Sequence, residues 1–401
     1  MLDRVFKAFR YRDFRLMWFG ACTSSVGTWM QSTAQSWLVY KLSNSPVYLG
    51  LDAFFAQIPI FLFSLLGGVY ADRKSRRTLL IISQCIQLTC AFVLATLAAT
   101  NVVKVWHIWC LSFMVGTAQS FGGPAYSALV PSLVGKEDLQ NAIALNSIQF
   151  NLARVVGPAL GGLALIKLGP AWCFTLNGIS YLAVIASLVS IHTNFIPPKT
   201  GRSVLDSMRE GVQFLWSREG MVGLVSIGFL VTLLSYPLIT FLPVLARNVF
   251  HREADTFTLF LCLSGAGSVV GALTVAAMHN QKGQARQSLA VMLLLGAFIT
   301  AIGFSRSLWL TCLFIFLSGV LLMIVFAVNS SLVQSHASDA MRGRVMSVYN
   351  LAFRGGMPMG SLLSGLAMSR TSAPITMAAN GIAIAAVAIS FLLAGRKLSK
   401  L

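Results

Sequence analysis

Three charged side chains lie inside long apolar stretches of the sequence, where a charge is costly and is kept for a function or for pairing. Arg154 and Arg354 lie near the middle of their stretches, and Asp52 lies a few residues into its own. Such a carboxylate can carry protons, can pair with an arginine, or can lie near the lipid headgroups, and the sequence leaves these interpretations open. Asp52 is thus the proton-coupling candidate. The arginines are candidates for binding a substrate or for coupling, with hydrogen bonding to helix carbonyls as the alternative.

These three charges leave an excess of one positive charge inside the apolar stretches, which favours an anionic or neutral amphiphile as the molecule bound there. Amide side chains within such stretches must face protein or water, because lipid offers them no hydrogen bonds. They are concentrated in some stretches, whereas the third, sixth, ninth and twelfth are mostly apolar and are expected to face lipid. The candidates for lining a central cavity are Gln31, Gln35, Gln119, Asn146, Arg154, Tyr236, Asn329 and Arg354.

One pattern occurs twice in the chain. Arg154 is followed by Pro158, and Arg354 by Pro358, so the pattern returns after half of the 401 residues. The pair Asn177-Gly178 also returns, as Asn380-Gly381. The sequence therefore predicts two related halves, and charged residues at mid-depth in duplicated helix bundles are typical of secondary transporters.

Composition supports this interpretation, because only 10% of residues are charged and 56% are hydrophobic. We expect an all-α, polytopic membrane protein with twelve transmembrane helices in two pseudo-symmetric six-helix bundles. The predicted divisions are residues 1–192, a cytoplasmic linker with an amphipathic helix at 193–219, lying along the inner membrane face, and residues 220–401. The predicted helices are 14–40, 47–71, 78–100, 106–131, 140–166, 171–192, 220–245, 256–279, 286–304, 308–335, 343–369 and 373–394.

The positions of the basic residues indicate an orientation. Of the 30 Lys and Arg residues, 21 fall in the loops and termini of one side, seven in those of the other, and two within the apolar stretches. By the positive-inside rule both termini are predicted to be cytoplasmic, in the inner membrane. The net charge of +18 is therefore an orientation signal, and no nucleic-acid partner is implied.

No pattern in the sequence indicates catalysis or a cofactor. The seven cysteines lie almost entirely in apolar stretches, without a C-x-x-C pair or histidines at ligand spacing, so neither disulfides nor a metal site are predicted. There is also no catalytic pair and no nucleotide-binding loop. We expect a protein that is not an enzyme and needs no cofactor.

The loop after the second predicted helix resembles the signature loop of the major facilitator superfamily. It has a glycine, three residues, Asp-Arg, and then a basic pair, although Ser75 stands where glycine is common. The resemblance implies that Asp72 and Arg73 latch an inner gate; the alternative is positive-inside charge alone. The gate-motif residues are Gly68, Asp72, Arg73, Arg76 and Arg77. The matching loop of the second half, residues 279–283, is degenerate.

A second motif, in the fifth predicted helix, resembles the antiporter motif of the same superfamily and implies export. Its residues are Gly157, Pro158, Gly161 and Gly162, and ordinary packing of small residues is the alternative. The first half also resembles the branch of secretion permeases that includes the enterobactin exporter, through segments 12–20 and 37–46. Thr28 departs from that branch, whose members often have an acidic residue there.

These resemblances imply a monomeric, proton-coupled exporter of a small amphiphilic molecule, such as a siderophore or a drug, which works by alternating access in the lipid bilayer. Two alternatives stay open. One is a proton-coupled uptake symporter, and the other is a membrane-embedded enzyme that acts on lipid or quinone.

Overall fold

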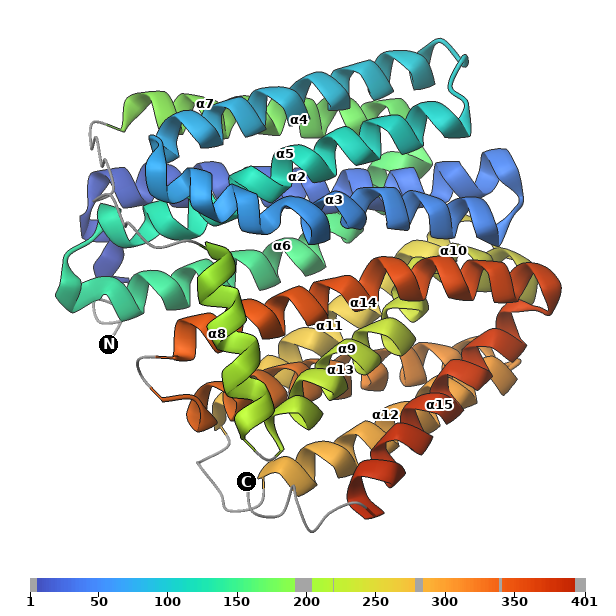
Figure 1. Ribbon diagram of the computed structural model, residues 1–401. Coiled ribbons are helices and arrows are strands. Elements are labelled where there is room, and N and C mark those ends of the chain that lie inside the picture. Colours follow the sequence, from blue (N-terminus) through green and yellow to red (C-terminus); the bar gives the residue numbers. More distant parts are fainter. Residues whose placement is uncertain (1–5, 192–203, 219, 278–283, 339–340, 394–401) are drawn as a thin grey trace. The chain divides into compact units, whose positions relative to one another are not determined.

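The computed structural model describes residues 6–191, 204–218, 220–277, 284–338 and 341–393, and all regular structure in them is helical (Figure 1). The first half contains η1 (Lys7–Arg10), α2 (Arg12–Ser43), α3 (Pro46–Arg73), α4 (Arg76–Ala99), α5 (Val105–Leu129), η2 (Val130–Leu133), η3 (Lys136–Asp138), α6 (Leu139–Lys167) and α7 (Pro170–Ser190). The second contains α8 (Val204–Ser217), α9 (Met221–Thr240), α10 (Leu242–Val244), η4 (Leu245–Val249), α11 (Ala254–Ala277), α12 (Gln284–Phe304), α13 (Leu308–His336), α14 (Arg342–Arg370) and α15 (Ala373–Leu393).

Within the described residues, twelve helices have at least 20 residues, which at 1.5 Å per residue is long enough to cross the roughly 30 Å hydrocarbon layer. Nine of them are also apolar enough to qualify as membrane spans by composition. The other three, α2, α5 and α14, are interrupted by more glycine, hydroxyl and amide residues. The prediction of an all-α polytopic membrane protein is confirmed.

The predicted helix boundaries agree with the structure to within about three residues, with one exception. The helix predicted over 220–245 ends at Thr240. Pro243 follows, and because its nitrogen cannot donate the helical hydrogen bond, the chain continues through the short α10 and the π-helical η4. The apolar pattern alone did not contain this interruption.

The helices form two compact units. Unit 1 consists of Met1–Ser43 and Phe55–Gly201, and unit 2 of Asn44–Phe54 and Arg202–Leu401. The first turns of α3 therefore belong to unit 2 by their contacts, and so does α8. The predicted division at 1–192, 193–219 and 220–401 stays a prediction, with residues 192–203 and 219 outside the described part of the chain.

The same helix pairs recur in both units. In unit 1, α2 packs against α6 and α7, and α4 packs against α5 and α7. In unit 2, α9 packs against α14 and α15, and α12 packs against α13 and α15. Counted from the first long helix of each unit, the pairs are identical, so the repeat in the sequence corresponds to a repeat in the packing.

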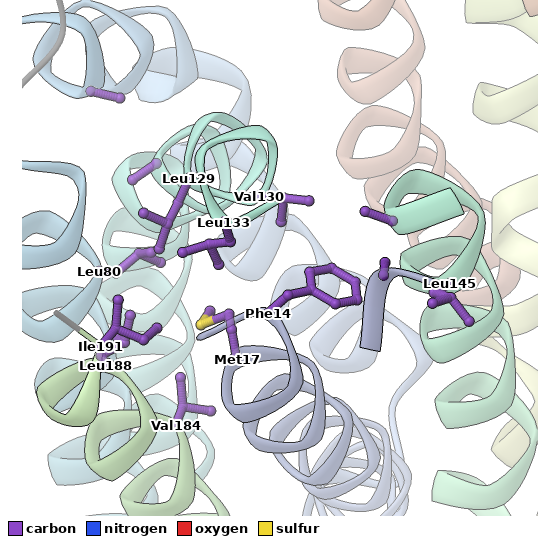
Figure 2. Packing of buried hydrophobic residues seen from close by; sticks show 14 residues of the cluster. Phe14, Met17, Leu80, Leu129, Val130, Leu133, Leu145, Val184, Leu188 and Ile191 are labelled. Carbon is purple, nitrogen blue, oxygen red and sulfur yellow. The ribbon is translucent and has the colours of Figure 1, made fainter. Parts of the chain in front are cut away.

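Each unit has a buried apolar cluster at the ends of its helices. In unit 1, Phe14 and Met17 of α2 meet side chains from α4, α5, α6 and α7 (Figure 2). In unit 2, Leu215 of α8 lies in a cluster with Leu224 of α9 and Val345 of α14. The segment before the first long helix is thus part of the packed structure in both units.

In unit 1, polar contacts also hold the segment that precedes α2. Arg10 forms ion pairs with Asp138, at 2.6 Å, and with Glu137, at 3.1 Å. The hydroxyl of Tyr11 donates to both carboxylates, at 3.2 Å each. Asp138 is only 4% exposed, so its charge depends on these partners. We call Arg10, Tyr11, Glu137 and Asp138 the first clamp.

An equivalent contact, which we call the second clamp, occurs in unit 2 with its charges reversed. Here Glu210 of α8 forms an ion pair with Arg344, in the first turn of α14. Gly211 lies directly on the backbone of Arg344, because a Cβ there would be 2.9 Å from its carbonyl oxygen. In both units, therefore, the segment before the first long helix is tied to the start of the fifth.

Candidate functional site

The glycines of the predicted antiporter motif lie where α6 meets α2. A Cβ at Gly157 would overlap the Cβ of Trp29, and one at Gly161 would lie 2.9 Å from the Cα of Met30. Pro158 and Gly162 are buried in the same helix. Because only glycine leaves room for this approach, the motif brings the backbones of the two helices into direct contact.

The second unit repeats this contact, although its sequence lacks the full motif. A Cβ at Gly356 would overlap Thr232 of α9, and one at Gly360 would overlap the carbonyl of Leu233. Pro358 is buried between the two glycines, whose spacing of four residues matches Gly157 and Gly161. The motif is therefore one copy of a packing contact that both units have.

The two arginines predicted as a pair have different surroundings. Arg154 is half-buried, and its guanidinium carbon lies 5.9 Å from the ring centre of Trp29, a cation–π contact. Phe150 packs edge-on against the same ring, at 6.4 Å. Arg354 is exposed and has no hydrogen bond or ion pair with the described residues. Arg154 is held by its own unit, whereas Arg354 has no such contact with the described residues.

Asp52 lies in the second turn of α3 and is 5% exposed. This part of α3 packs on α14, since a Cβ at Gly50 would lie 2.6 Å from the carbonyl oxygen of Ser361. A Cβ at Gly365 would lie 3.0 Å from the carbonyl oxygen of Pro46. The proton-coupling candidate therefore belongs to the same unit as Arg354 and lies on a helix that contacts α14.

Gln31 takes part in a buried polar group between α2 and α7. Its side-chain oxygen accepts a hydrogen bond of 2.7 Å from Asn177, which also accepts one from Ser180 at 3.1 Å. Tyr181, on the next turn of α7, donates to Gln87 of α4 at 3.3 Å and contacts the Thr28 hydroxyl at 3.3 Å. These contacts fix the orientation of the polar face of α2.

The remaining cavity candidates have varied positions. Gln35 donates to Ser112 at 2.9 Å, and Asn146 accepts from Tyr126 at 3.1 Å. Asn329 is 2% exposed and donates to the carbonyl of Leu224 at 3.0 Å, so it joins α13 to α9. Gln119 is exposed and Tyr236 is half-buried. Their roles in lining a cavity stay predictions.

The gate-motif residues lie at the junction of α3 and α4. Arg76 donates to the carbonyl of Ala128 at the end of α5, and Arg77 to that of Val189 at the end of α7, both at 2.7 Å. Cations are favourable at helix C-termini, so these arginines join the ends of three helices. Ser75 accepts from the backbone nitrogen of Thr78, which makes it the N-cap of α4.

The structure gives less support for the predicted roles of the other gate-motif residues, Gly68, Asp72 and Arg73. A Cβ at Gly68 would meet no atom of the described residues within 4 Å, whereas one at Gly67 would overlap the carbonyl of Ser120. The close approach of α3 to α5 is therefore one residue earlier than the motif suggests. Arg73 is exposed at the end of α3, and the side chain of Asp72 lies outside the described part of the structure.

Sequence reasoning missed Asn177, Tyr181 and Trp29 as site residues. The stretch that contains Asn177 and Tyr181 was predicted to face lipid, yet both side chains are buried against α2 and α4. In the sequence, Asn177 stands out only as part of the repeat. An amide within an otherwise apolar helix was the available signal, because such a group needs a protein partner in lipid.

The packing of the long helices is that of membrane transporters whose structures have been solved. A crystal structure of the nucleoside transporter NupG matches 95% of this chain and 98% of its own, with a TM-score of 0.76 at 12% identity. A bacterial homologue of the human lysosomal transporter Spinster, in an inward-facing and occupied conformation, matches 96% of this chain and 97% of its own. Its TM-score is 0.71 at 14% identity. At these identities the likeness concerns the fold alone.

Within this class, the chain belongs to the family of transmembrane secretion effectors, whose model matches residues 4–399. It is similar to the enterobactin exporter EntS of Shigella boydii, at 27% identity over 95% of this chain and 91% of that protein. It is also similar to the staphyloferrin A transporter of Staphylococcus aureus, at 24% identity over 93% of this chain and 94% of that protein. The resemblance predicted from the motifs is confirmed, and the protein is a multi-pass membrane transporter.

Proposed function

We propose that this transporter is a proton-coupled exporter of a small amphiphilic molecule, with a siderophore as the favoured substrate and a drug as the second choice. It acts as a monomer in the inner membrane with both termini in the cytoplasm, and it works by alternating access. The observation that carries the proposal is the glycine contact of α6 on α2, repeated by α14 on α9. Backbone-to-backbone contacts make each pair of helices one rigid element, and alternating access requires rigid bodies that rock against each other.

The class of substrate is inferred from the names of the relatives and from charge. Two similar proteins are named for the siderophores enterobactin and staphyloferrin A. The candidate residues supply positive charge at Arg154 and Arg354, and an aromatic face at Trp29. This combination suits an anionic or neutral amphiphile, because the two arginines repel cationic molecules.

The proton-coupling step is assigned to Asp52. It is the sole acidic side chain inside a predicted span, and it is buried. A carboxylate that exchanges protons between the two sides can couple export to the proton gradient. We also propose that the substrate leaves chemically unchanged, so that the protein is not an enzyme; recovery of intact substrate after transport tests this.

Transport into proteoliposomes with an imposed pH gradient tests the direction of coupling. Purified protein is reconstituted, radiolabelled siderophores and drugs are supplied outside, and the lumen is made acidic. An antiporter accumulates the substrate in the lumen as protons leave, whereas a proton symporter expels it. The sign of the result does not depend on the orientation of the protein in the vesicle. Accumulation only with an alkaline lumen would replace export by uptake.

A further inference from the structure

The first turns of α2 have one face that is packed against the rest of unit 1 and an opposite face that is uncovered. Phe14 and Met17 point into the buried cluster of unit 1 (Figure 2). Arg12, Arg15 and Phe19 are exposed, and the last of them is 58% exposed. At 100° per residue these three positions form one stripe, on the side of the helix opposite the cluster.

Neither neighbouring helix covers this stripe. Trp18 turns toward α6, where its ring nitrogen donates to the carbonyl of Leu145 at 2.9 Å. On the other flank Gly20 contacts α7, because a Cβ there would lie 3.2 Å from the carbonyl oxygen of Ala183. The stripe lies between these two contacts, so in a membrane it faces the lipid at the end of the span.

Aromatic rings border the stripe and form a shelf of fixed shape. Phe9 of η1 is at the centre, with Phe6 stacked on it at 5.7 Å, Phe19 at 5.8 Å and Trp18 at 5.1 Å. The outermost rings, Phe6 and Phe19, are exposed. The shelf is held in place because Ala8 is fully buried and its backbone nitrogen donates to Asn141 at 2.9 Å.

The charges beside the shelf are positive and uncommitted. Lys7, Arg12 and Arg15 are exposed and form no ion pair or hydrogen bond through their side chains with the part of the chain that the structure describes. The nearby carboxylates of Glu137 and Asp138 are bound by Arg10. Among the described residues of this segment Asp13 is the remaining acid, and it lies on a different side of the helix from Arg15.

We propose that this surface is a binding site for an anionic phospholipid. The phosphate of the headgroup is held between Arg12 and Arg15, with Lys7 beside it, and the first acyl segments lie on Phe19 and Phe6. Arginine binds phosphate through two parallel hydrogen bonds, and aromatic rings are favourable at the boundary between headgroups and hydrocarbon. Phe19 is one turn, about 6 Å, along α2 from Arg15, which matches the step from phosphate to acyl chain.

The site does not depend on the proposed function, since it uses none of the residues assigned to substrate or protons. Basic residues near a membrane surface each contribute enough attraction that loss of two weakens anionic lipid binding about 30-fold. Native mass spectrometry of the purified full-length protein measures this with phosphatidylglycerol and phosphatidylcholine as probes. We expect one phosphatidylglycerol to bind more tightly than the rest, and Arg12→Gln/Arg15→Gln to lose it.

The matched control is Arg306→Gln/Arg370→Gln, which removes two arginines that are exposed elsewhere on the chain. We expect this control to keep the tightly bound lipid. That result would show that the loss of two positive charges does not by itself weaken lipid binding. Arg12→Lys/Arg15→Lys should restore most of the binding, and unchanged melting temperatures show that all variants are folded. Equal binding by the parent and the Gln variant, or equal loss in the control, would overturn the site.

Two further measurements separate a lipid from a free phosphate. Phe19→Ala keeps both arginines and should still weaken phosphatidylglycerol binding, because the acyl chain loses its shelf. Glycerol 3-phosphate, which has the headgroup chemistry without acyl chains, should compete poorly. Full competition by glycerol 3-phosphate, or full lipid binding by Phe19→Ala, would show that the surface binds phosphate alone and would refute the proposal.

Discussion

Asp52 and Arg354 lie on helices that pack against each other within one unit. Gly50 lies opposite Ser361, and Gly365 lies opposite Pro46, so α3 and α14 run antiparallel at this contact. Extending that register puts Arg354 about five residues, roughly 7 Å, beyond the level of Asp52. The acid and the cation therefore lie at levels of the unit that differ by less than two helical turns.

At this scale we predict that Asp52→Asn abolishes uphill transport and spares substrate binding and downhill exchange, because it removes the proposed proton carrier and leaves the arginines. Arg354→Ala should instead weaken binding, most for anionic substrates. Efflux from proteoliposomes with and without an imposed pH gradient measures both. Asp52→Glu is the control and should keep part of the coupling. If Asp52→Asn still concentrates substrate, coupling runs through another group.

The residue scale is also where sequence reasoning was least complete. It selected Arg154 and Gln31 from their polarity in apolar stretches, but not Trp29 or Asn177, which hold them. The partner of Gln31 is 146 residues away in the chain. Local periodicity specifies the face of a helix, whereas the residue it meets depends on how two distant helices approach each other.

At the scale of helices, the two glycine contacts should be equivalent in function. We predict that Gly161→Val impairs transport, because the added carbons separate α6 from α2 and overpacking costs about 1–3 kcal/mol. Gly360→Val should have a similar effect through α14 and α9. Gly123→Val is the matched control, since a Cβ there meets no atom of the described residues within 4 Å. Transport rates in proteoliposomes and melting temperatures in detergent measure the effects. Normal transport by Gly161→Val and Gly360→Val would contradict the prediction.

The first clamp gives a second prediction at this scale. Arg10→Asp should destabilise the folded protein, because it places a third carboxylate beside Asp138, which is 4% exposed, and Glu137. Adding Asp138→Arg to the same chain should recover much of the loss. Thermal unfolding of both single variants and the double variant measures this coupling. Additive losses would mean that the ion pair is unimportant and that packing alone holds the segment.

Helix positions were the most predictable feature of the fold. Runs of apolar residues long enough to cross a membrane must be helical, so α3, α4, α6 and α7 of the first unit followed from composition. The end of α9 did not follow, because Pro243 interrupts a run that stays apolar. The docking of α8 depends on Gly211 lying against Arg344, more than 100 residues away, which no local pattern contains.

For the whole molecule, the asymmetry of basic residues predicts the orientation. A cysteine introduced at Gln284, the first residue of α12, in a chain without its seven native cysteines should be labelled only from the cytoplasm. A cysteine at Arg306, between α12 and α13, should be labelled only from outside and is the control. A membrane-impermeant maleimide applied to intact cells and to inverted vesicles measures this, and reversed labelling would invert the map.

The reversed charges of the two clamps have a consequence for synthesis of the chain. Each unit has to recruit its own leading segment to the start of its fifth helix while a similar surface is present in the other unit. If α8 docked on the first unit, Glu210 would meet the acidic Glu137 and Asp138, and if η1 docked on the second, Arg10 would meet Arg344. Both wrong pairings set like charges together. Opposite polarity thus lets a duplicated protein distinguish its halves as they emerge from the ribosome.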